Sequence, residues 1–365
     1  MDRKNFFAPL AAICAAILMQ GCATSVDSPI NEAEKRYFDA WVAVNIPDWT
    51  KTEHWIYIDE AGETVGTGDP VAEGYLFVEY TVRDLNGNIT SSTSEETAKR
   101  LNTYKPQNYY GPKVWNTSSM NAGVYYAVFD LGGMKIGGKR TAVIPGWMAS
   151  YTKYSTEEEY INNVTGNSDS IYEIELTGQT DDITGWENGQ MADFVEDNSY
   201  GLFTQLSPSD TTETGFYYEG KIFADGAFSS YDIEKLDTDT TSTLFASDTT
   251  VYINYTGMLL NGQAFDTTKE RTAKDNNIYS SSKTYEPVKI TWSENWSGIK
   301  MGDDGNSVIS GFAKTLWRMS CVEGVKSATG MFYSGFGYSY SGSGDVIPAY
   351  APLIFEIEFT EAPED

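Results

Sequence analysis

The stretch NYTGMLLNGQAFDTTKER, residues 254–271, combines a strand, a turn and an unusual pair of side chains. Its first residues alternate as in a half-buried strand, and Asn261-Gly262 then favours a tight turn. After the turn, Phe265 stands directly before Asp266, with Arg271 five residues further on. The stretch therefore predicts a strand and turn that place an aromatic ring beside a carboxylate.

A similar pattern occurs earlier in the chain. VEYTVRDLNGN (78–88) matches INYTGMLLNGQ (253–263), and YEIELT (172–177) matches FEIEFT (355–360). Further markers lie between these matches in the same order, and a helical pattern followed by a strand opens each block. We interpret the chain as two homologous domains, 31–177 and 188–362, with a polar linker at 178–187 and a second-domain core at about 245–360.

Each repeat predicts mostly antiparallel strands around one short helix. In the second repeat, Val308, Ile309, Phe312, Leu316 and Met319 fall on one helical face. Ala127, Leu131 and Met134 stand at matching offsets in the first repeat. We expect an α+β fold in which each sheet curls over a buried helix.

The composition excludes several kinds of function. The chain has 365 residues, a formal net charge of −27 and one histidine. So acidic a surface repels nucleic acid. A single histidine, His54, cannot build a His-based zinc site, a Cys-His dyad or a Ser-His-Asp triad, and the pattern around it, EHWIYID, suggests a strand in which it is not a ligand.

The first 21 residues resemble a bacterial lipoprotein signal. Arg3 and Lys4 precede an apolar run that is too short to span a membrane and ends at Met19-Gln20-Gly21-Cys22. This resemblance implies that Cys22 carries lipid, that 22–30 form a tether and that the protein is anchored in a bacterial cell envelope. An ordinary secretory signal is the alternative. With Cys14 removed and Cys22 acylated, Cys321 would be left alone.

At the level of motifs, the second repeat resembles the FKBP-type peptidyl-prolyl isomerases over residues 245 to 360. The motifs are Tyr255-Thr256-Gly257, Phe265-Asp266-Thr267-Thr268, Val308-Ile309-Ser310-Gly311-Phe312 with Met319, and Ile347-Pro348 before the closing strand. The resemblance implies two FKBP-like domains, Xaa-Pro polypeptides as clients and no cofactor or metal.

The resemblance also implies a proline pocket and a role for each residue in it. The walls would be Tyr255, Phe265, Val308, Ile309, Ile347 and Phe355, with Phe312 as the floor. Asp266 and Tyr338 would supply polar contacts, with Phe336 as the alternative to Tyr338. Arg271 would pair with Asp266, and the Ile309 amide would hold the substrate carbonyl.

The sequence departs from the family at several of these positions. Phe312 replaces the usual tryptophan, Val288 replaces a usual phenylalanine, and residues 293–306 form an insertion before the helix. In the first repeat, the spacing puts Thr90 and Ser91 at the positions of Phe265 and Asp266, or Ile89 at that of Phe265 after a one-residue slip. That repeat also has Ala127 at the floor position and Ser150 at that of Tyr338, which predicts a pocket unfit for catalysis.

Prolyl isomerisation suits a sequence with few catalytic groups. Amide resonance gives a rotation barrier of about 18–20 kcal/mol, and the twisted amide is less polar than the planar one. A dry aromatic pocket would therefore favour the transition state. Two alternatives remain: a non-catalytic peptide-binding or chaperone-like module, and a glycan-binding surface lipoprotein built from tandem β-sandwiches.

Overall fold

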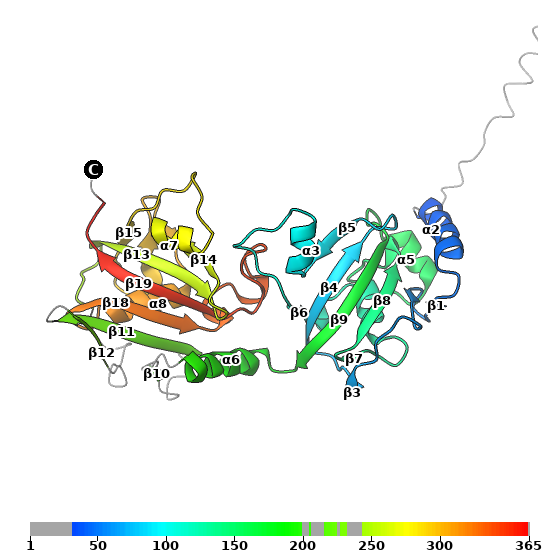
Figure 1. Cartoon of the computed structure of the whole chain (residues 1–365), viewed down its shortest axis with the longest axis horizontal. Coiled ribbons are helices and arrows are strands. Elements are labelled where there is room, and N and C mark those ends of the chain that lie inside the picture. The colour runs from blue at the N-terminus through cyan, green and yellow to red at the C-terminus, as the bar shows by residue number, and fades with distance from the viewer. Residues whose placement is uncertain (1–30, 199–203, 206–214, 225–226, 232–242, 364–365) are drawn as a thin grey trace, which may run out of the picture.

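The computed structural model describes residues 31–198, 204–205, 215–224, 227–231 and 243–363. They form two lobes, with helix α6 (Ile183–Asn198) lying between them in the chain (Figure 1). The predicted lipoprotein signal and Cys22 lie outside the described residues. Among the helices that are described, none combines the length and apolar character needed to cross a bilayer.

The first lobe is built around one antiparallel sheet. Its order is β1-β2-β8-β9-β4-β5, with β6 also paired to β4, while β3 and β7 form a separate pair. The strands are β1 (Thr50–Lys51), β2 (Tyr57–Ile58), β3 (Thr67–Pro70), β4 (Tyr75–Arg83), β5 (Ile89–Ser92), β6 (Lys113–Asn116), β7 (Lys135–Ile136), β8 (Lys139–Ile144) and β9 (Ser170–Thr180). The helices are α2 (Glu32–Asn45), α3 (Glu95–Arg100), α4 (Ala122–Phe129) and α5 (Glu157–Asn163), with 3-10 turns η1 (Thr117–Ser119) and η2 (Gly146–Met148).

The second lobe repeats this plan. Its sheet order is β10-β11-β18-β19-β13-β15-β16-β17, with β12 on β11 and β14 on β13. The strands are β10 (Thr204–Gln205), β11 (Phe216–Ala224), β12 (Ala227–Tyr231), β13 (Thr250–Leu259), β14 (Ala264–Thr267), β15 (Val288–Thr291), β16 (Lys300–Met301), β17 (Asn306–Ser307), β18 (Val325–Phe332) and β19 (Leu353–Thr360). The helices are α7 (Glu270–Asp275) and α8 (Ser310–Met319), with 3-10 turns η3 (Trp296–Gly298), η4 (Ser334–Phe336) and η5 (Ser339–Ser341).

The two lobes share strand register as well as strand order. Tyr80 and Tyr255 stand 175 residues apart (255 minus 80), and so do helices α3 and α7. Thr93 Oγ1 accepts from the Tyr80 amide at 3.0 Å, and Thr268 Oγ1 accepts from the Tyr255 amide at 3.0 Å. Such matched hydrogen bonds support the interpretation of an internal repeat.

The expected α+β architecture is confirmed. The strand pairings of the described residues are antiparallel, and one helix packs against each main sheet. In the second lobe, a Cβ on Gly311 of α8 would lie 2.4 Å from the Phe332 ring, so glycine is what lets the helix approach β18 closely. Each lobe has its own apolar core, and neither is a β-sandwich of two packed sheets.

The helix of the first lobe lies earlier in the sequence than expected. Asn121 caps α4 by accepting from the Val124 amide at 3.0 Å, and the helix ends at Phe129. Leu131 and Met134 therefore follow the helix, and Leu131 adopts a φ of 53°. Asn121 and Ile309 are the N-caps of α4 and α8, which places Val124, and not Ala127, at the position of Phe312.

The insertion at residues 293–306 extends the sheet. Strands β16 and β17 form a short hairpin at the edge next to β15. Trp296 in η3 packs against the second core, and Lys314 Nζ lies 4.5 Å from the centre of its ring. The insertion is thus an addition to the sheet edge and to the packing around α8.

The stretch expected to be a polar linker is a strand and a helix. β9 continues to Thr180 and α6 begins at Ile183, so most of 178–187 has regular structure. Trp186 stacks on Phe77 of the first lobe with ring centres 4.4 Å apart. Glu187 is 1% exposed and accepts from the Ser334 amide at 2.6 Å and from Ser334 Oγ at 2.8 Å. The start of α6 therefore contacts both lobes.

Burial of Glu187 makes a pH-dependent contribution to stability. Burial raises the pKa of Glu187 from 4.5 to about 7, despite the two hydrogen bonds from Ser334. A carboxyl group whose pKa is raised by folding favours the folded state below about pH 4.5, and this contribution is lost as the pH rises through 7.

We expect Glu187→Gln to remove this dependence. Glutamine keeps an acceptor for the Ser334 amide and cannot ionise. The stability of the variant relative to wild type should rise by about 3 kcal/mol between pH 4 and pH 8, at 1.36 kcal/mol per pKa unit. Urea unfolding of both proteins at pH 4, 6 and 8 would measure this. Parallel pH profiles would show that folding does not shift the pKa of Glu187.

Candidate functional site

A cluster of aromatic rings is formed by side chains from α8, β13, β14 and β19. Phe355 is 5% exposed, and its ring centre lies 5.2 Å from that of Phe312, 5.7 Å from Phe265 and 6.2 Å from Tyr255. Phe312 is 3% exposed and meets Tyr255 edge to face at 5.5 Å. Tyr255 and Phe265 are half-buried, so the cluster has a buried base and a partly exposed edge.

A glycine on β13 makes room for two of these rings. Gly257 pairs with Asp266 on one side and with Phe355 on the other. A Cβ at this position would lie 2.5 Å from the Phe265 ring and 2.9 Å from the Phe355 ring. Any larger residue would therefore displace the wall and base of the aromatic cluster.

Asp266 lies at the exposed edge of the cluster. Tyr255 Oη donates a hydrogen bond to Asp266 Oδ2 at 2.6 Å, and Lys283 Nζ forms an ion pair with Asp266 Oδ1. Burial and the negative charge of Asp266 raise the pKa of Tyr255, so its hydroxyl stays protonated as a donor. Burial and the negative charge of Asp266 also raise the pKa of Tyr338.

The predicted ion pair between Arg271 and Asp266 is wrong. Arg271 lies on α7 with 93% of its side chain exposed, and its Nε is 3.6 Å from Asp275 Oδ2, one helical turn further on. The helix begins at Glu270 and directs Arg271 into solvent. Lys283, from the loop that follows α7, takes the partner position, although nothing in its local sequence distinguishes it.

The remaining residues of the predicted pocket contact the same core. Val308 and Ile309 are half-buried, with Ile309 as the N-cap of α8, and Ile347 is 4% exposed. Phe336, the alternative to Tyr338, contacts Tyr333 and Phe216 in the interior. Val308, Ile309, Phe336 and Ile347 thus pack on the same core as the aromatic cluster, whereas Tyr338 is exposed and Arg271 lies in solvent.

The first lobe has different side chains at the equivalent positions. Val82 pairs with Ser91 in the way that Gly257 pairs with Asp266, so Thr90 replaces Phe265 and no slip to Ile89 occurs. Val82 also pairs with Tyr172, which stands where Phe355 does. A valine in place of the glycine is thus matched by a small residue in place of the phenylalanine. Tyr80 and Tyr172 keep two of the aromatic positions, whereas Thr90, Ser91 and Val124 replace Phe265, Asp266 and Phe312.

A cavity of about 570 Å³ occupies this part of the first lobe. Thr90, Ser91, Val124 and Tyr172 line it, together with Tyr340 and Tyr350 from the second lobe. The Tyr350 ring meets Tyr75 edge to face at 5.3 Å, and the Tyr109 amide donates to the Asp345 carbonyl at 2.8 Å. The segment that follows Tyr338 therefore contacts the first lobe and its cavity. The sequence did not indicate this contact between the lobes.

Solved structures of peptidyl-prolyl isomerases are structural matches to this chain, whereas the comparisons of its sequence find none. No protein-family model matches the chain, and no curated protein matches its sequence. An isomerase from Pseudomonas syringae pv. tomato, described as a peptidyl-prolyl cis-trans isomerase, is a structural match at 18% identity and a TM-score of 0.28, covering 50% of this chain and 98% of that one. The three FKBP domains of wheat FKBP73 match at 14% identity and a TM-score of 0.25, covering 85% of this chain and 95% of that one. FkpA from Escherichia coli matches at 17% identity and 0.28, covering 42% and 61%.

Proposed function

We propose that the second lobe is a peptidyl-prolyl cis-trans isomerase of the FKBP type. The observation that carries this proposal is the aromatic cluster of Tyr255, Phe265, Phe312 and Phe355, with Asp266 fixed at its open edge. The arrangement offers an apolar surface for a proline ring and a single oriented carboxylate. It also agrees with the motifs of the sequence.

The chemistry needs no bond to break. Uncatalysed isomerisation of an Xaa-Pro bond takes on the order of tens to hundreds of seconds. As the amide twists, its charge separation falls, and an apolar surface stabilises this state relative to the planar one. Phe265 and Phe355 would hold the proline ring, and the Ile309 amide would hold the carbonyl of the peptide. Asp266 would act on the twisted amide through its charge and dipole, not as a base.

The network around Asp266 suits that role. Tyr255 and Lys283 fix both carboxylate oxygens, so the side chain does not have to reorganise when a peptide binds. Tyr338 is 36% exposed, and burial together with the charge of Asp266 raises its pKa. A preorganised dipole of this kind is worth more at a site from which water is excluded.

We further propose that the clients are Xaa-Pro-containing segments of secreted or envelope proteins. The sequence of residues 1–22 supports this, because a lipid-anchored protein would meet unfolded chains after export. A net charge of −27 also disfavours nucleic acid as a partner.

An assay of the whole chain on short Xaa-Pro peptides tests the proposal. We expect the cis-to-trans rate to rise in proportion to protein concentration. A folded protein that leaves the rate unchanged would contradict catalysis and favour a second candidate function, peptide binding without isomerisation. The cavity of the first lobe favours that candidate specifically, because tyrosines from both lobes line it.

A further inference from the structure

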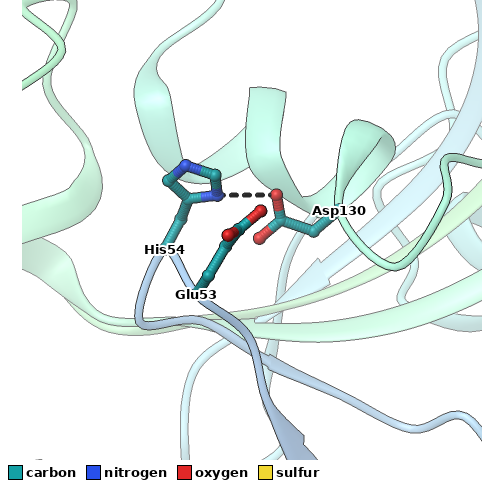
Figure 2. Close-up of side chains that lie close together, drawn as sticks. All are labelled: Glu53, His54 and Asp130. Atoms are coloured by element: carbon teal, nitrogen blue, oxygen red, sulfur yellow. Dashed lines mark hydrogen bonds and ion pairs between the residues drawn. The ribbon is translucent and has the colours of Figure 1, made fainter.

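Three side chains outside the aromatic cluster lie together in the first lobe. Glu53 and His54 belong to the turn between β1 and β2, and Asp130 caps the C-terminal end of α4. One ligand atom from each of these residues lies within 4.8 Å of the others. Figure 2 shows the two carboxylates facing one another beside the imidazole ring. His54 is therefore in a turn, and not in the strand that its sequence suggested.

Asp130 is the buried member of this trio. Its side chain is 5% exposed, and Oδ1 lies 2.7 Å from His54 Nδ1. Its other oxygen, Oδ2, is buried without a hydrogen-bond partner among the described residues. Buried carboxylate oxygens are normally paired, so an orphaned one calls for an explanation such as a bound ion.

The electrostatic surroundings favour a cation here. Asp130 stands at the C-terminal end of a helix, where the helix dipole already places partial negative charge. Glu53 adds a second carboxylate. Arg140 donates to the Asp130 carbonyl at 3.0 Å, but its guanidinium is paired with Glu63 at 2.8 Å. Among the described residues, neither carboxylate of the trio forms an ion pair with a lysine or arginine.

We propose that Glu53, His54 and Asp130 bind a divalent transition-metal ion of the zinc type. One imidazole and two carboxylates form a ligand set that zinc accepts, whereas calcium prefers six to eight oxygen ligands. Three protein ligands leave a position for water or another group. A site of this mixed kind needs only one histidine. The single histidine of the sequence therefore excludes a His-based zinc site but not this one.

The geometry requires only a small adjustment. Two tetrahedral ligands at about 2.0–2.1 Å from one zinc ion lie roughly 3.3 Å apart. The observed 2.7 Å between Nδ1 and Oδ1 would therefore have to widen by roughly 0.6 Å, which a rotation of the Asp130 carboxylate can supply. Neutral His54 with its proton on Nε2 would present Nδ1 to the ion. The His54 ring is held in place by stacking on Tyr126, with ring centres 3.6 Å apart.

Calorimetric titration of the metal-free chain with Zn²⁺, Mn²⁺ and Ca²⁺ tests the site. We expect one zinc ion per chain, with Mn²⁺ and Ca²⁺ binding at least about tenfold more weakly. Asp130→Asn keeps the shape of the side chain and should weaken zinc binding by about tenfold or more, as should Glu53→Gln. Asp303→Asn is the matched control, because Asp303 is 93% exposed in the second lobe.

A thermal measurement separates loss of the site from loss of the fold. Zinc should raise the melting temperature of the wild-type chain and of Asp303→Asn equally, and should raise that of Asp130→Asn by clearly less at the same zinc concentration. Equal zinc isotherms for wild type and Asp130→Asn would overturn the proposal. So would a wild-type chain that binds no stoichiometric zinc. The test is independent of isomerase activity.

Discussion

Replacing Asp266 with alanine should lower kcat/KM for an Xaa-Pro peptide by about 100-fold while the protein stays folded. A 100-fold loss corresponds to about 2.7 kcal/mol of transition-state stabilisation. This is the low end of the roughly 100- to 1,000-fold range for removing one preorganised polar group from an active site, as suits a carboxylate that is partly exposed. Because 41% of the Asp266 side chain is exposed, its removal should leave the packing of the lobe intact.

Two basic residues give this prediction its matched controls. Lys283→Ala removes an ion pair that is partly exposed, and should lower the rate by about two- to fivefold, in line with the 0.2–1 kcal/mol of exposed pairs. Arg271→Ala should leave the rate unchanged, because its side chain lies in solvent beside Asp275. An Arg271 variant as impaired as Asp266→Ala would contradict the structure of the site.

The second large effect concerns the buried base of the cluster. Phe355 contacts the rings of Tyr255, Phe265, Phe312 and Phe332, and is 5% exposed. Phe355→Ala should lower the unfolding free energy of the second lobe by about 3–5 kcal/mol, because the neighbouring rings cannot fill the space. Hydrogen exchange of amides in β13 and β19 would report the loss for that lobe alone.

A control variant distinguishes the loss of buried packing from the loss of any aromatic ring. Tyr340 is 72% exposed, so Tyr340→Ala should change stability by no more than about 0.5 kcal/mol. Exchange rates in β4 and β9 of the first lobe should be the same in both variants. Equal stability of Phe355→Ala and wild type would show that the cluster is not close-packed.

Strand register was predictable from the sequence because strand patterns are local. The offset between Tyr80 and Tyr255 and the register of the following turn fix which residues face one another across the strands. The equivalence of Ser91 with Asp266 was therefore predicted correctly from spacing alone.

Other features depend on directions in space that spacing does not give. Arg271 and Lys283 are both near Asp266 in sequence, and only the orientation of α7 decides between them. The start of α4 could have been found from Asn121, a good N-cap residue. The contact of Asp130 with His54 joins residues 76 positions apart and has no sequence signature.

The most direct test of the proposed function is exchange NMR of an Ala-Pro peptide with the whole chain and with Phe265→Ala. The account predicts accelerated exchange between the cis and trans resonances, with chemical-shift changes at the Phe265 and Ile309 amides. With Phe265→Ala, we expect neither faster exchange nor a shift change at the Ile309 amide. Shift changes confined to the first-lobe cavity around Tyr172, or binding at the second lobe with no faster exchange, would contradict it.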